Sequence, residues 1–374
     1  MKKNLCYTAA FLSVLFMFIF VAGCVEKDQP AESFTAPAGP LVSPQALKPA
    51  DLEIAWAYNL PMAPGEGLKD FSILGDRLYT ISGRNYLVSL DREKAQPAYS
   101  WQLARPGLTF CGLRQYDSRI YSIVGADLVS FDAQDGTVRL SKPLGFGPVC
   151  PPARNTAFFY VAGTDRRVHV MRADDMVRLF EVSANDDGNI TCVTAADDFV
   201  VFATDAGTLA AMLPDKPVKL WRFEASGAIN GPVAYDGRQF IFSSKDAYVY
   251  AVDRSRGKLI WKFLTPALLT DPPKVTQHYV YQYVAGHGLV AIDKATGALA
   301  WRLPEGIDLL AENGRRVCVI AEQSKLVVFD NKNLKKLYEV EIPAVTRWAA
   351  NTADAAIYLA DESGRIACIK PIKY

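Results

Sequence analysis

The chain has 374 residues with 41 Lys and Arg, 40 Asp and Glu and three His, which gives a formal net charge of +1. Nucleic-acid-binding proteins usually show a basic excess or a basic stripe. Neither is present, so charge excludes that class of function.

The first 24 residues have the layout of a secretory signal. Two lysines follow Met1, an apolar run extends from about residue 5 to residue 22, and Gly23 precedes Cys24. This order describes a targeting segment rather than an element of a domain. The small residues before Cys24 resemble a bacterial lipobox, with Val21 where that motif usually has Leu. The resemblance implies a signal peptide over residues 1–23 and lipid on Cys24. An uncleaved membrane anchor and an ordinary secretory signal are the alternatives.

Residues 24–50 are predicted to form a flexible tether. The segment is rich in Pro, Ala, Ser and Gln and has few large apolar residues, so it cannot bury enough surface to offset the entropy of ordering. In enteric lipoproteins an Asp after the lipidated Cys marks retention at the inner membrane, and Val25 stands here instead. This resemblance implies an outer-membrane protein that faces the periplasm.

The remaining chain, residues 51–374, repeats one pattern eight times. Eight apolar strands end at intervals of 37 to 42 residues, and five of them end at Asp. A repeat of about 40 residues is typical of a β-propeller, in which each unit forms one blade. The strand ends are Asp91, Asp132, Arg172, Pro214, Asp253, Asp293, Asp330 and Lys370.

Each repeat contains four short predicted strands. In residues 231–263, GPVAYDGRQFIFSSKDAYVYAVDRSRGKLIWKF, three turns separate four runs rich in Val, Ile, Phe and Tyr. Such runs favour strands, and Asp-Gly and other short Gly-containing turns join neighbouring strands antiparallel. We therefore predict an all-β fold, an eight-bladed β-propeller of four-stranded antiparallel blades.

The two ends of the repeat array are incomplete in a complementary way. A fourth-strand sequence around Trp56 precedes the first complete repeat, and the chain ends just after its eighth third strand. We predict that the N-terminal strand completes the last blade, so that the two ends of the ring pair with each other. The eight fourth-strand sequences contain Trp56, Trp101, Leu140, Phe180, Trp221, Trp261, Trp301 and Tyr338.

Three residue types recur at fixed places in the repeat and have a structural explanation. The strand-end Asp can accept hydrogen bonds from turn N–H groups, Gly suits the positive φ of the turn that follows, and Trp is large enough to fill the gap between blades. An aromatic cage for a ligand is the alternative, but Trp residues spaced one blade apart do not converge. The clearest repeat positions are Asp253, Gly257, Trp261, Asp293, Gly297 and Trp301.

Ala291, Asp293, Thr296, Gly297 and Trp301 together resemble the repeat motif of quinoprotein (PQQ-type) propellers. The quinone dehydrogenases of that group are longer, and many carry a vicinal Cys pair and a calcium-binding Glu, Asn and Asp set. This chain has no Cys-Cys step and no residues that match that site. We therefore predict the propeller without a cofactor, a metal or a catalytic residue.

A lipid-anchored chain of this length with eight such blades is also similar to the propeller subunit of the outer-membrane β-barrel assembly machinery (BamB-type). That resemblance implies a non-enzymatic scaffold whose protein partner is the barrel-inserting outer-membrane protein. Two alternatives stay open. One is a PQQ- or calcium-dependent oxidoreductase, and the other is an envelope propeller that binds a small ligand or a polysaccharide.

The other chemically notable residues favour packing over chemistry. Cys111, Cys150 and Cys192 fall near the starts of three successive first strands, where neighbouring strands are too far apart for easy disulfides. His287 stands in a Gly-flanked turn, and residues 184–190 lack the oxygen spacing of a calcium loop. Structural roles are the simpler interpretation for all of them.

First strands vary most between the repeats, and one of them contains Arg347 and Trp348. Trp and Arg are frequent anchors of protein interfaces. We predict that these two residues contact a partner at the mouth of the central channel.

Overall fold

A computed structural model describes residues 39–332 and 335–372. All the described residues belong to one compact unit. The predicted signal peptide and Cys24 lie outside the described residues, as does the predicted tether up to residue 38. Their roles therefore stay predictions.

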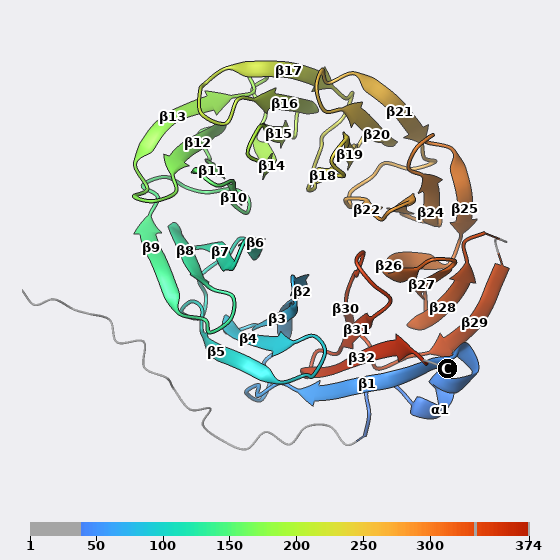
Figure 1. Ribbon diagram of the computed structural model, residues 1–374. Coiled ribbons are helices and arrows are strands. Elements are labelled where there is room, and N and C mark those ends of the chain that lie inside the picture. The colour runs from blue at the N-terminus through green and yellow to red at the C-terminus, as the bar shows by residue number, and fades with distance from the viewer. Residues whose placement is uncertain (1–38, 333–334, 373–374) are drawn as a thin grey trace, which may run out of the picture. The chain divides into compact units, whose positions relative to one another are not determined.

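In the described residues, eight four-stranded antiparallel sheets are arranged in a ring, which confirms the predicted eight-bladed propeller (Figure 1). The first four blades contain β2 (Leu68–Leu74), β3 (Arg77–Ser82), β4 (Tyr86–Asp91) and β5 (Pro97–Gln102); β6 (Arg114–Tyr116), β7 (Arg119–Val124), β8 (Asp127–Asp132) and β9 (Val138–Pro143); β10 (Ala153–Arg154), β11 (Phe158–Ala162), β12 (Arg167–Arg172) and β13 (Arg178–Ser183); and β14 (Ile190–Ala195), β15 (Val200–Thr204), β16 (Thr208–Met212) and β17 (Lys219–Glu224).

The last four blades follow the same order. They contain β18 (Ala234–Tyr235), β19 (Gln239–Ser243), β20 (Tyr248–Asp253) and β21 (Leu259–Leu264); β22 (Lys274–Val275), β23 (Tyr279–Val284), β24 (Gly288–Asp293) and β25 (Leu299–Leu303); β26 (Gly306–Asn313), β27 (Arg316–Ala321), β28 (Lys325–Asp330) and β29 (Lys335–Glu341); and β30 (Arg347–Ala349), β31 (Ile357–Ala360), β32 (Arg365–Pro371) and β1 (Leu52–Asn59).

Burial follows the position of each strand in its blade. Every residue of β15 and β16 is buried, because the middle strands of a blade pack against neighbouring blades on both faces. The outermost strand β17 instead alternates between partly buried and exposed residues. The core therefore consists of apolar layers between adjacent blades, and the innermost and outermost strands carry the accessible side chains.

The N-terminal strand closes the ring as predicted. β1 pairs antiparallel with β32, from Leu52 opposite Pro371 to Asn59 opposite Arg365, and so supplies the outermost strand of the eighth blade. Residues from the two ends of the fold thus share one sheet, and neither can leave without breaking that sheet.

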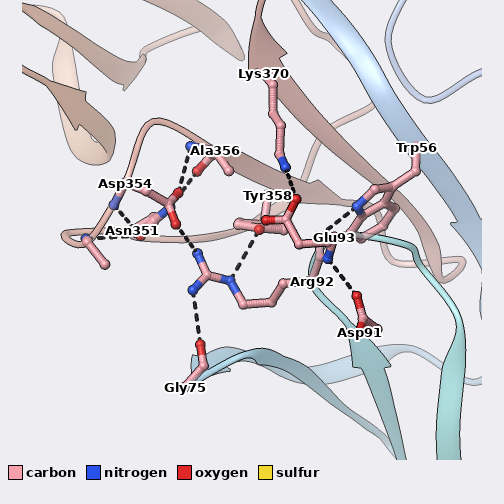
Figure 2. A network of polar contacts seen from close by, with 11 residues as sticks. Trp56, Gly75, Asp91, Arg92, Glu93, Asn351, Asp354, Ala356, Tyr358 and Lys370 are labelled. Carbon is pink, nitrogen blue, oxygen red and sulfur yellow. Dashed lines mark hydrogen bonds and ion pairs between the residues drawn. The ribbon is translucent and has the colours of Figure 1, made fainter.

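Arg92 joins the first blade to the eighth (Figure 2). Its guanidinium donates to Tyr358 Oη at 3.2 Å and to Gly75 O at 3.0 Å, and it pairs with Asp354 at 2.8 Å. The Arg92 carbonyl accepts the indole N–H of Trp56 at 2.8 Å. A single turn residue therefore ties together the first blade and the eighth, where the ring closes.

The repeat positions form a contact that recurs between blades. Trp261 Nε1 donates to Lys294 O of the next blade at 2.9 Å, and its ring covers Gly297. Asp293 Oδ1 accepts the N–H groups of Ala295 and Thr296 at 3.1 and 2.9 Å. These two hydrogen bonds fix the turn that presents the Lys294 carbonyl to the indole.

The same contact occurs one blade earlier, and a variant of it occurs one blade later. Trp221 donates to Arg254 O at 2.8 Å above Gly257, and Asp253 accepts two N–H groups of that turn. Trp301 instead donates to the side chain of Asn331, at 2.8 Å. The indole N–H of each of these tryptophans therefore has its hydrogen-bond acceptor on the neighbouring blade.

The first blade differs from the sequence alignment by two residues. Tyr99, and not Trp101, pairs with the third strand at the place that Trp261 occupies in the fifth blade. The Tyr99 ring covers Gly136, as the Trp261 ring covers Gly297. Alignment on the nearest Trp therefore selected the wrong aromatic residue of β5.

Residues 41–50 fold onto the propeller, although the sequence predicted a tether up to residue 50. The helix α1 (Pro44–Leu47) and the 3-10 turn η1 (Lys48–Ala50) precede β1 and contact β29. Four apolar side chains of this segment join the core between the seventh and eighth blades, which is why the segment is ordered. They are Leu41, Val42, Leu47 and Ala50.

Substitution of Gly297 by Ala tests the aromatic contact. Gly297 has φ +75°, where Ala costs about 1–2 kcal/mol, and an added Cβ would lie 2.7 Å from Trp261 Cγ, which adds about 1–3 kcal/mol of overpacking. Gly286→Ala is the matched control, because Gly286 has φ +72° and open space around its Cβ position. Urea unfolding should show a larger loss of stability for Gly297→Ala. Equal losses would contradict the packing role of the indole.

Candidate functional site

The predicted partner contacts Arg347 and Trp348 lie on β30, the innermost strand of the eighth blade. Trp348 is partly buried, and its indole N–H donates to Asp308 Oδ2 of β26 at 3.0 Å. Arg347 is exposed and pairs with Glu362 at 3.0 Å. Trp348 thus links two inner strands, while Arg347 is the more accessible of the two. Their role in partner binding stays a prediction.

Two inner-strand carboxylates, Asp70 and Asp308, are buried enough that desolvation raises the pKa of each. Each of the two residues follows an irregularity in strand register. The Asp70 carboxylate accepts the N–H of Phe71 at 2.9 Å, and the Asp308 carboxylate accepts the N–H of Leu309 at 2.8 Å. Perturbed carboxyls can mark functional sites. Their matching positions in two blades favour a structural role in holding the bulges.

A cavity of about 620 Å³ opens beside the inner strands of the second to fifth blades. Arg114 is the one charged residue among those that line it. The hydroxyls of Thr191 and Thr194 donate to backbone carbonyls of the fifth-blade entry, at 2.5 and 3.3 Å. Two of the polar side chains that line the cavity are therefore engaged by the protein itself.

Two of the three first-strand cysteines, Cys150 and Cys192, line this cavity. Burial raises the pKa of Cys150 to about 12 and that of Cys192 to about 11. Burial also raises the pKa of the partly exposed Cys111. A thiol must ionise to act as a nucleophile, so burial favours a packing role for Cys150 and Cys192.

Two motifs weighed in the sequence are engaged in ordinary loop contacts. His287 lies in the turn between β23 and β24, where its ring Nδ1 is 3.0 Å from Arg302. In the loop of residues 184–190, Asp186 accepts hydrogen bonds from Thr204 at 2.6 Å and from Gly188 N at 3.0 Å. These bonds account for the polar character of both turns.

The outermost strands of the second to sixth blades expose large apolar side chains, a feature that the sequence analysis missed. The seven members are 40–60% exposed and are called the outer row here. They are Val138, Leu179, Leu220, Leu259, Ile260, Leu264 and Leu299. The described outer strands of the other three blades, β1, β5 and β29, expose no large apolar side chain. The outer row therefore occupies one continuous sector of the circumference (Figure 1).

Bulges explain why three members of the outer row point outward. Leu179, Leu220 and Ile260 are each skipped in the pairing of the third strand with the fourth. A bulge adds one unpaired residue and re-aims its side chain. The sequence signal is an apolar residue directly before the aromatic residue of the fourth strand, at Phe180, Trp221 and Trp261.

The chain is similar to known proteins in sequence and in fold. The family model described as outer membrane protein assembly factor BamB matches residues 206–311. The predicted resemblance to the BamB-type propellers is confirmed. A relative from Shewanella oneidensis, named outer membrane protein assembly factor BamB, is 24% identical over 226 residues. The match covers 56% of this chain and 56% of that relative, so it spans little more than half of the relative's length.

Solved structures share the fold at low sequence identity. BamB from Moraxella catarrhalis is 12% identical with a TM-score of 0.64, over 85% of this chain and 99% of that chain. The computationally designed Ika8 protein is 14% identical with a TM-score of 0.63, over 81% of this chain and 96% of that chain. BamB-type and designed propellers therefore share this architecture.

Among residues 39–332 and 335–372, no helix has the length and apolar character needed to cross a membrane.

Alkylation of the cavity thiols tests their protonation state. With pKa values of about 12 and 11, Cys150 and Cys192 are almost entirely protonated at pH 8. An ordinary thiol with a pKa of about 8.5 is about a quarter ionised there. Iodoacetamide should therefore modify both at least about 100-fold more slowly in the native protein than in urea, as followed by mass spectrometry of peptides. Rapid native labelling of Cys150 would show a reactive thiol and contradict the packing role.

Proposed function

We propose that this protein is a lipid-anchored, non-enzymatic scaffold that binds protein partners during outer-membrane β-barrel assembly. Similarity to proteins named outer membrane protein assembly factor BamB supports a role in outer-membrane protein assembly. The resemblance of residues 1–24 to a lipoprotein signal supports an anchor on Cys24 and a place at the outer membrane, facing the periplasm. The barrel-inserting outer-membrane protein is the proposed partner.

The observation that carries a binding role is the outer row. Monomeric soluble proteins rarely leave extended apolar patches open, and such patches often mark protein interfaces. Here the exposed apolar residues follow five consecutive outer strands and are absent from the described outer strands of the other three blades. A property confined to one sector is not required by the propeller fold, which all eight blades share.

The bulges indicate how a partner binds. The outer edges of β13, β17 and β21 pair with no other described strand, so a strand could in principle be added there. A bulge twists an edge away from regular pairing and disfavours such addition. We therefore propose contact through the exposed side chains of the outer row, with Arg347 and Trp348 at the channel mouth as a second contact.

Crosslinking in the native envelope tests the proposal. The full-length protein is crosslinked in cells, captured, and its partners are identified by mass spectrometry. The barrel-inserting outer-membrane protein should be recovered. A double variant, Leu220→Glu with Ile260→Glu, should reduce that recovery roughly ten-fold or more, because buried apolar anchors dominate interface energies.

The matched control is Ala55→Glu with Ala98→Glu. These alanines are exposed and occupy the corresponding bulges of β1 and β5, outside the outer row. The control adds the same charge and should leave recovery unchanged. Equal recovery with both double variants would disprove the outer row as the docking surface. Enrichment of a different envelope complex by the wild-type protein would disprove the assembly function itself.

A further inference from the structure

The third blade contains a buried histidine between two carboxylates. His169 lies on β12 and is 1% exposed. Its Nε2 is 3.0 Å from Asp165 Oδ2, and its Nδ1 is 3.4 Å from Glu181 Oε2. Nδ1 has no hydrogen-bond partner, although it is buried. One imidazole nitrogen is therefore paired, and the other is directed to a carboxylate without a hydrogen bond.

A corresponding contact in the fifth blade shows what a purely structural version looks like. Tyr250 occupies the place of His169, and its hydroxyl lies 2.7 Å from Asp246, which occupies the place of Asp165. The residue opposite Tyr250 on the fourth strand is Lys262. A hairpin contact of this kind thus needs only one hydroxyl and one carboxylate, with no acid opposite.

The third blade adds the two features that the fifth lacks. Glu181 lies directly opposite His169 in the pairing of β12 with β13. An imidazole, unlike a phenol, also keeps a nitrogen lone pair when its other nitrogen donates a hydrogen bond. Phe146 stacks on the His169 ring with the centroids 3.9 Å apart, which restricts the orientation of the ring.

These atoms have the spacing of metal ligands. Zinc binds His nitrogen at about 2.0–2.1 Å and carboxylate oxygen at about 2.0–2.2 Å, so two tetrahedral ligands lie about 3.4 Å apart. Nδ1 and Glu181 Oε2 are separated by 3.4 Å. Asp165 then accepts the Nε2–H, as outer carboxylates do for metal-bound histidines. The half-exposed side chains of Asp165 and Glu181 leave a route to solvent.

We propose that His169 Nδ1 and Glu181 Oε2 bind a divalent transition-metal ion of the zinc class, with Asp165 as the positioning residue. Water completes the coordination. Arg167 pairs with the other oxygen of Glu181 and places a competing positive charge beside the ion. The site is therefore an exchangeable one with two protein ligands, unlike a closed structural zinc site with four.

Zinc titration of the full-length protein, purified in detergent without a polyhistidine tag, tests the proposal. Calorimetry should show one saturable site in the wild type. Glu181→Gln removes a ligand at a partly exposed position and should abolish binding. Asp165→Asn should weaken binding about 10–100-fold, the usual effect of losing an outer carboxylate. Arg167→Gln should tighten binding, because it removes the competing cation.

Two control variants keep the test specific to this site. His169→Tyr recreates the Tyr250–Asp246 contact, and so should retain the hairpin while losing zinc. Asp246→Asn makes in the fifth blade the change that Asp165→Asn makes in the third, and it should leave zinc affinity unchanged. Absence of saturable binding to the wild type would overturn the proposal. Binding that survives in Glu181→Gln or His169→Tyr would also overturn it.

Discussion

Contact between an outer-strand aromatic ring and the turn of the next blade is the interaction on which this propeller depends. Each sheet has only four strands and must bury both faces of its middle strands against neighbours. The indoles of Trp56, Trp221 and Trp261 each cross the gap and donate to a carbonyl that follows a strand-end Asp. Because the contact satisfies a polar group while burying a large ring, it fixes the angle between blades as well as their separation.

That contact also shows which residues have a structural role in the ring and which remain candidates for a role in binding. Asp253, Gly257 and Trp261 are committed to the turn or to the neighbouring blade, so their recurrence carries no information about binding. Function is better sought where one blade differs from the others. The outer row and the His169–Glu181 pair meet that criterion, because each is confined to particular blades.

The fold could be predicted from sequence because its signals are local and repeated. Apolar strands that end at intervals of 37 to 42 residues predicted the blades, and the unmatched strand at Trp56 predicted the closure. Residues 41–50 were misjudged because a few apolar residues in a Pro-containing segment do not look like a core, and only their packing against the seventh and eighth blades makes them part of one. Glu181 and His169 are twelve positions apart, and only strand register places them together.

The place where the chain enters the propeller is relevant to the proposed scaffold. Residues 41–50 and β1 lie against β29 and β32, in a sector whose described outer strands expose no large apolar side chain. The outer row begins at β9 and ends at β25, on other blades (Figure 1). In the proposed scaffold, the chain enters the propeller at one sector and exposes its apolar surface at another. Attachment and docking then do not compete for the same strands, which is the arrangement that a tethered scaffold requires.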